Sequence, residues 1–145
     1  MANATMTKFG YPQTRIADTR HWVVLLRPEQ PTLGSLVLVS KDEATQFSGL
    51  SIEAFADLGI AVAGIERVLK AFVDYDRINY LMLMMVDPDV HLHVVPRYET
   101  VRSHAGIAFP DAGWPGPPAL SAAVRLDPDA ADDLCRRLSL LWERA

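Results

Sequence analysis

The chain has 145 residues, of which 50% are hydrophobic and 22% are charged, and its formal net charge is −4. This composition excludes an intrinsically disordered chain and predicts one globular domain over residues 1–145. A general nucleic-acid binder would show a basic stripe, and a membrane helix would need about 20 consecutive apolar residues, so we expect neither a nucleic-acid partner nor a membrane span. The polar start lacks a signal-peptide core and the single cysteine, Cys135, cannot form an internal disulfide, which predicts a cytoplasmic protein.

The first half of the chain predicts two neighbouring strands. Residues 21–27 and 33–41 are rich in β-branched and aromatic or aliphatic side chains, as strands are. The segment 28–32 between them contains two prolines and breaks the first strand. Residues 42–47 are expected to form a short helical turn that Gly49 closes.

A long helix is predicted from Ser51, whose hydroxyl suits an N-cap because it can accept a hydrogen bond from the first turn. Gly59 and Gly64 each cost about 1 kcal/mol of helix propensity relative to alanine, and we expect them where the helix lies close to a sheet. The apolar side chains recur at steps of three and four, which is the spacing of an amphipathic helix. This predicted stripe consists of Phe55, Leu58, Val62, Ile65, Leu69 and Phe72.

The second half predicts a β-hairpin. Residues 78–86 form an almost continuous apolar run, which is typical of a central strand that is covered on both faces. The turn-forming residues 87–88 lead into a second strand over residues 90–98, and the tight connection predicts antiparallel pairing. Pro96 cannot donate to a ladder, so regular pairing is expected to end there.

The C-terminal part predicts a long loop followed by a helix. Residues 103–120 are rich in glycine and proline and are expected to cross the surface as a loop. Asp127 and Pro128 then provide an N-cap and a first helical residue. The apolar stripe of the last helix consists of Ala131, Leu134, Leu138 and Leu141. With the strands above, these helices predict an α+β fold.

The chemically informative stretch is the predicted strand after the turn. Because side chains two residues apart in a strand point to the same face, about 6.6 Å apart, Asp89, His91 and His93 should form one polar row. Imidazole is a nucleophile that can carry a proton near neutral pH, and a neighbouring carboxylate, histidine or backbone carbonyl can fix its tautomer. The other face would pack on the long helix and consists of Val90, Leu92 and Val94.

Other interpretations of this row remain open. A strand histidine is often structural and hydrogen-bonded to a neighbour. Alternatively, His91 and His93 with Asp89 or Glu99 would give two imidazoles and a carboxylate, a ligand set known for non-haem iron. The spacing to Glu99 and the two predicted helices conflict with the all-β cupin fold that uses such a set, so we expect no metal.

Residues 89–95 resemble the signature of the histidine triad (HIT) family, in which three histidines alternate with apolar residues and two further apolar residues follow. Asp89 takes the place of the first histidine, so the chain resembles a variant of the family. Residues 33–41 correspond to an upstream family strand, and the long helix, the hairpin and the motif strand follow in family order. The resemblance covers roughly residues 20–100 and leaves a loop and helix over 101–145. It implies a HIT-like α+β fold, with an antiparallel sheet, one long packed helix and a C-terminal helix.

The resemblance also implies an activity, namely a two-step nucleotidyl transfer without a cofactor. His91 would attack the α-phosphorus of a dinucleoside polyphosphate or nucleoside phosphoramidate, and water would hydrolyse the nucleotidyl-histidine. His93 would contact phosphate oxygens, and Asp89 would orient His91 as a carboxylate orients other catalytic histidines. The family commonly forms homodimers in which the sheet continues across the two-fold axis.

The chain departs from the family at further positions that are expected to bind substrate. Ser35 replaces a histidine of the upstream strand, and Met85 stands where many members have a phosphate-binding glutamine. Asp89 adds a negative charge beside an anionic substrate, which Arg27 or Arg97 could offset. These departures leave a second hypothesis, a HIT domain that binds a nucleotide or another phosphorylated metabolite without turnover.

Overall fold

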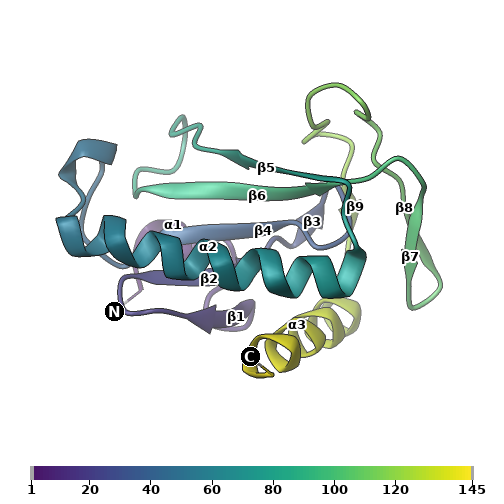
Figure 1. The fold of residues 1–145 in the computed structure, drawn as a ribbon, viewed down its shortest axis with the longest axis horizontal. Coiled ribbons are helices and arrows are strands. Elements are labelled where there is room, and N and C mark those ends of the chain that lie inside the picture. Colours follow the sequence, from purple (N-terminus) through teal and green to yellow (C-terminus); the bar gives the residue numbers. More distant parts are fainter. Residues whose placement is uncertain (1, 145) are drawn as a thin grey trace.

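The computed structural model describes residues 2–144, and its centre is a five-stranded antiparallel sheet (Figure 1). The strands lie in the order β1 (Arg15–Asp18), β2 (Trp22–Leu26), β4 (Leu36–Ser40), β6 (His91–Arg97) and β5 (Arg77–Leu81). Short ladders join β3 (Glu29–Gln30) to β9 (Val124–Arg125) and β7 (Arg102–His104) to β8 (Ile107–Phe109). The helices are α1 (Ala4–Lys8), the 3-10 helix η1 (Phe47–Gly49), α2 (Ile52–Val73) and α3 (Pro128–Glu143). The predicted α+β architecture is confirmed.

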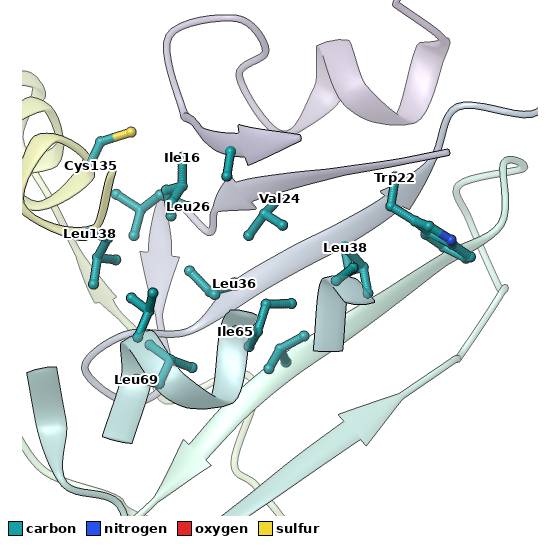
Figure 2. Close-up of a cluster of buried hydrophobic side chains, with 14 of the residues drawn as sticks. Ile16, Trp22, Val24, Leu26, Leu36, Leu38, Ile65, Leu69, Cys135 and Leu138 are labelled. Carbon is teal, nitrogen blue, oxygen red and sulfur yellow. The ribbon is translucent and has the colours of Figure 1, made fainter. Parts of the chain in front are cut away.

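The main core lies between one face of this sheet and the helices α2 and α3 (Figure 2). Alternate residues of β2 and β4 point into it, among them Leu26 and Leu38, which are completely buried. Trp22 is also completely buried, and its indole N–H donates to the carbonyl oxygen of Ala54 on α2 at 2.8 Å. This bond fixes the start of the long helix against β2.

The long helix begins where the sequence predicts. The Ser51 hydroxyl accepts a hydrogen bond from the Ala54 backbone N–H at 3.0 Å, and the helix ends at Asp74, whose φ of 46° is left-handed. The buried face of α2, however, is rotated from the predicted stripe. Phe55 is 41% exposed, whereas Ala54 and Ala61 are completely buried. The small alanines let the helix backbone approach the sheet, so the largest apolar side chains lie at the edge of the contact.

A buried carboxylate contributes to the same helix face. Asp57 accepts hydrogen bonds from the Thr19 hydroxyl at 2.6 Å and from the His21 backbone N–H at 2.7 Å. It therefore ties the turn between β1 and β2 to α2. Because hydrophobic periodicity ignores polar residues, it could not find this contact.

The prediction of a central strand over residues 78–86 is wrong. Strand β5 ends at Leu81 and lies at the edge of the sheet, paired only with β6 among the described strands. The apolar residues that follow belong to a loop, in which Met85 and Val86 are 84% and 82% exposed. The predicted antiparallel pairing of β5 with β6 is confirmed. This pairing continues one residue past Pro96, to Arg97, whereas the pairing of β4 with β6 stops at Val94.

Several other elements differ from the prediction. The helical turn falls at η1 rather than at residues 42–47, and the expected loop 103–120 begins with the hairpin β7–β8. Helix α3 begins as predicted, with the Asp127 carboxylate accepting from the Ala130 N–H at 2.8 Å. The polar N-terminal segment forms α1, which the sequence pattern did not indicate. Across residues 2–144, every helix is too short or too polar to span a bilayer.

The two glycines of α2 give a matched test of the helix packing. A Cβ at Gly59 would meet nothing within 4 Å, whereas a Cβ at Gly64 would overlap the indole ring of Trp142 on α3. We expect Gly59→Ala to raise the free energy of unfolding by up to about 1 kcal/mol through helix propensity. Gly64→Ala should lower it by about 1–3 kcal/mol through overpacking. Urea denaturation would check this, and equal stabilisation by both substitutions would contradict the described contact between α2 and α3.

Candidate functional site

Two histidines of β6 share one sheet face, as the alternation predicts. The imidazole rings of His91 and His93 meet edge to face, with centroids 5.2 Å apart, on the side of the sheet away from α2. Leu92 and Val94 point the other way, into the main core. Both histidines are largely buried, with exposed fractions of 2% and 7%, yet they form the floor of a cleft of about 320 Å³.

A backbone hydrogen bond fixes the tautomer of His91. Its Nδ1 lies 2.7 Å from the carbonyl oxygen of Asp89. A carbonyl oxygen can only accept, so Nδ1 carries the proton. In the neutral ring, Nε2 then holds the free lone pair and is the nucleophilic atom.

His93 is held in its neutral form. Burial, together with the nearby Arg27 guanidinium and the His91 imidazole, lowers its pKa to about 4. Its Nδ1 is buried and has no hydrogen-bond partner among the described residues. A neutral imidazole with a free ring nitrogen can exchange a hydrogen bond with a ligand that enters the cleft.

The N-terminal segment forms one wall of the cleft, which the sequence analysis missed. The Phe9 ring centroid lies 5.8 Å from that of His93 and 6.2 Å from that of His91. Lys8 reaches across the rim and pairs with Asp87 at 2.9 Å. Below them, Met6 packs on the sheet in a small second core with Val23, Leu25, Val37 and Val39. The apolar residues between positions 6 and 11 were the available signal, although nothing in the sequence said which face they cover.

The Asp89 side chain does not point to His91, which corrects the expected polar row of three. Asp89 lies in a bend just before β6, and its Oδ2 accepts hydrogen bonds from the Thr5 backbone N–H at 3.2 Å and hydroxyl at 3.0 Å. The same residue therefore contacts His91 through its backbone carbonyl and the N-terminal segment through its carboxylate. The expected support of the imidazole comes from the main chain.

Arg27 and Met85 both line the cleft. Arg27 follows β2 and donates through Nη1 to the Glu29 carbonyl oxygen at 2.9 Å, while its Nε is buried without a partner in the described part of the chain. Burial lowers the pKa of this guanidinium, which still stays charged at neutral pH. Met85 forms part of the rim and is mostly exposed.

A second hollow of about 400 Å³ adjoins the cleft. The two share residues 8–9 together with Arg27 and Glu29, and the hollow adds Arg125, which pairs with Glu29 at 3.1 Å. Positive side chains thus line both spaces, Glu29 also lines both, and Asp87 lines the cleft.

Ser35 and Arg97 lie away from the histidines, which corrects their expected place in the site. The Ser35 hydroxyl is completely buried and donates to the Thr32 carbonyl oxygen at 2.9 Å, in the turn before β4. Arg97 is at the other end of β6, where its guanidinium donates to Asp111 at 2.7 Å and to Asn79 at 2.8 Å. Because these groups already occupy it, Arg97 cannot offset a charge at Asp89.

No family model matches the sequence, and no curated protein matches it. Solved structures do match. A histidine triad protein from Bradyrhizobium japonicum is 21% identical with a TM-score of 0.72, covering 95% of this chain and 94% of that one. A HIT protein from Sinorhizobium meliloti is 18% identical with a TM-score of 0.73, covering 95% of this chain and 93% of that one. A hypothetical histidine triad nucleotide-binding protein from Sulfolobus tokodaii is 15% identical with a TM-score of 0.66, covering 90% of this chain and 84% of that one. The chain has the histidine triad fold.

Within the HIT fold, the alternative metal site is not assembled. In the described range 2–144, no three side chains of His, Cys, Asp or Glu are grouped so that they could hold a metal ion. The Asp89 carboxylate is bound to Thr5, and Glu99 lies beyond the far end of β6. The imidazole pair thus lacks the carboxylate that the sequence-based alternative requires.

The low pKa of His93 predicts a specific loss of stability in acid. Between pH about 4 and 6.5, the unfolded chain binds a proton at this residue that the folded chain does not, so the free energy of unfolding rises with pH across this window. It should therefore fall on going from pH 6.5 towards pH 4, and His93→Gln should reduce this loss by at most about 3 kcal/mol. Urea unfolding of both proteins at several pH values would measure the difference. Parallel curves for the two proteins would contradict it.

Proposed function

We propose that this chain is a HIT-type nucleotide hydrolase or nucleotidyl transferase that acts through a nucleotidyl-histidine on His91. One observation carries the proposal, the bond between His91 Nδ1 and the Asp89 carbonyl oxygen at 2.7 Å. It leaves Nε2 unprotonated in the neutral ring and stabilises the positive charge that the ring acquires when Nε2 forms a bond.

In the proposed reaction, the Nε2 lone pair of His91 attacks the α-phosphorus of a nucleotide conjugate. The bond from phosphorus to the leaving phosphate or amine breaks, and its electron pair leaves with that group, which takes up a proton. Water then attacks the same phosphorus and gives up a proton to the solvent, the P–N bond breaks, and its electrons return to Nε2. The products are a nucleoside monophosphate and the free leaving group.

Arg27 is the group of the cleft best suited to an anionic substrate. Its buried Nε has no partner among the described residues, and guanidinium groups bind phosphate oxygens well. Lys8 also lines the cleft but pairs with Asp87, and Glu29 is a further carboxylate of the lining. Neutral His93 can donate a hydrogen bond to a phosphate oxygen. The Asp89 carboxylate faces Thr5 and does not line the cleft, so its repulsion of phosphate is smaller than the sequence suggested. The Sulfolobus tokodaii protein is described as nucleotide-binding, which supports the same class of ligand.

A binding module without turnover is the second candidate. Met85, at the rim of the cleft, has no proton to give a leaving group and only a weak acceptor atom. Ser35, buried under its own turn, has no contact with the cleft that would compensate.

Rapid quench with a dinucleoside polyphosphate or adenosine phosphoramidate, followed by mass spectrometry, tests the enzyme proposal. We expect a transient nucleotidyl adduct on His91 and release of mononucleotide. Because His91→Ala removes the nucleophile itself, it should reduce turnover by a factor on the order of 10³ or more. His104→Ala is the matched control, since His104 lies on β7 and pairs with Asp133 outside the cleft.

Ligand-induced thermal stabilisation without product or adduct would instead favour the binding module. Equal turnover by the wild type and His91→Ala would exclude His91 as the nucleophile, whichever substrate is used.

We further propose that the protein is a homodimer in which edge strand β5 continues the sheet into a second copy. The outer edge of β5 is paired with no other described strand, and edge strands present free backbone donors and acceptors. Light scattering after size-exclusion chromatography should give about twice the chain mass of 16.1 kDa. A single-chain mass at all protein concentrations would contradict the dimer. The cytoplasmic location and the lack of a cofactor stay predictions.

A further inference from the structure

Residues 3–9, which we call the N-terminal arm, cross the open face of the sheet and are held by polar bonds along their length. Asn3 donates through Nδ2 to the Ser40 carbonyl oxygen at 3.0 Å. Near the other end of the arm, Lys8 pairs with Asp87. Between them, Thr5 is completely buried and donates both its backbone N–H and its hydroxyl to the Asp89 carboxylate. The central contact therefore joins two segments that are 84 residues apart in the chain.

We propose that Asp89 is a positioning residue that fastens the arm across the motif strand, and that the arm in turn determines the width of the histidine cleft. Asp89 occupies the place of the first motif histidine, but its carboxylate faces away from His91 and towards the arm. The role of Asp89 is thus to build a wall of the site. Its consequence for substrates rests on the proposed function.

The chemistry of the contact requires a carboxylate. One Asp89 oxygen accepts from two donors of Thr5, and bonds to a charged acceptor are stronger than bonds between neutral groups. A neutral imidazole has a single acceptor nitrogen, so a histidine at this position could not accept both bonds. An asparagine keeps the shape but loses the charge.

The arm acts on the site through Phe9. Its ring contacts both imidazoles and covers His93, whose side chain remains only 7% exposed although it belongs to the cleft. Phe9 and Lys8 also separate the cleft from the adjoining hollow, since both spaces are lined by these two residues. An arm that lifts would join the two spaces and admit water and bulkier leaving groups to the histidines.

Hydrogen exchange of the arm tests the fastening directly. Thr5→Val is nearly isosteric, removes the hydroxyl and leaves every charge in place. Thr7→Val is the matched control, because Thr7 is an exposed residue of the same helix, and its hydroxyl contacts only the Asn3 carbonyl oxygen. We expect backbone exchange in residues 3–9 to rise about tenfold in Thr5→Val, Asp89→Asn and Asp89→His. The exchange should stay within about twofold of the wild type in Thr7→Val.

The titration of His93, followed by NMR, tests whether the arm shapes the site. The groups that face His93 are Arg27 after β2, His91 on its own strand, Asp87 in the loop, and Lys8 in the arm. Because Thr5→Val changes none of these charges, a rise in the pKa of His93 in this variant would report lost coverage by Phe9. Phe9→Ala should produce the same rise, and combining it with Thr5→Val should add little.

Kinetics would extend the test to substrates. With a compact nucleotide conjugate, we expect Thr5→Val to raise KM severalfold with a smaller change in kcat, and to improve the relative use of a bulkier leaving group. Faster exchange of the arm with no change in the His93 titration would overturn the proposal, because the contact would then be purely structural. Exchange in Thr5→Val and Asp89→Asn that equals that in Thr7→Val would overturn it as well. If no protein forms product, the proposed enzyme function fails, but the exchange and titration results still decide the role of Asp89.

Discussion

The alternation of side chains along β6 is the constraint on which both the core and the site depend. On one face, Leu92 and Val94 join the core that α2 covers. On the other, His91 and His93 form the floor of the cleft. Because a strand has only two faces, the packing that buries the aliphatic side chains also fixes the orientation of both imidazoles. The backbone bond from the Asp89 carbonyl then sets the tautomer, so the nucleophile depends on main-chain geometry more than on any side-chain partner.

This constraint explains what the sequence could predict. The 3.6-residue period predicts α2 and α3, the β-branched and aliphatic composition predicts β2 and β4, and the HIT resemblance gives the order of the elements. Local cap chemistry at Ser51 and Asp127 was also predictable, since a cap depends on residues three positions away. The position of His91 and His93 on one face follows from the strand alone.

What the sequence could not predict are contacts between distant segments. The apolar run over residues 78–86 predicts a buried strand, whereas its second half forms an exposed loop, because hydrophobicity does not reveal what covers a segment. Phe9 contacts His93 although the two residues are more than 80 positions apart in the chain. Arg97 is held away from the histidines by an ion pair with Asp111. The strand pattern predicts that the Asp89 carboxylate faces the His91 imidazole. In the structure it instead accepts hydrogen bonds from the backbone N–H and the hydroxyl of Thr5.

The 84-residue separation between Thr5 and its carboxylate partner has a consequence for synthesis on the ribosome. The first residues of the chain emerge well before the strand that they cover has been made. At about 5–20 residues per second, this delay is on the order of 10 s. During that time the N-terminal arm lacks the carboxylate that fastens it, although β2 and β4, on which Met6 packs, have already been made. The histidine cleft therefore cannot be completed before residues 89–93 have been made, whereas α3 is made later still.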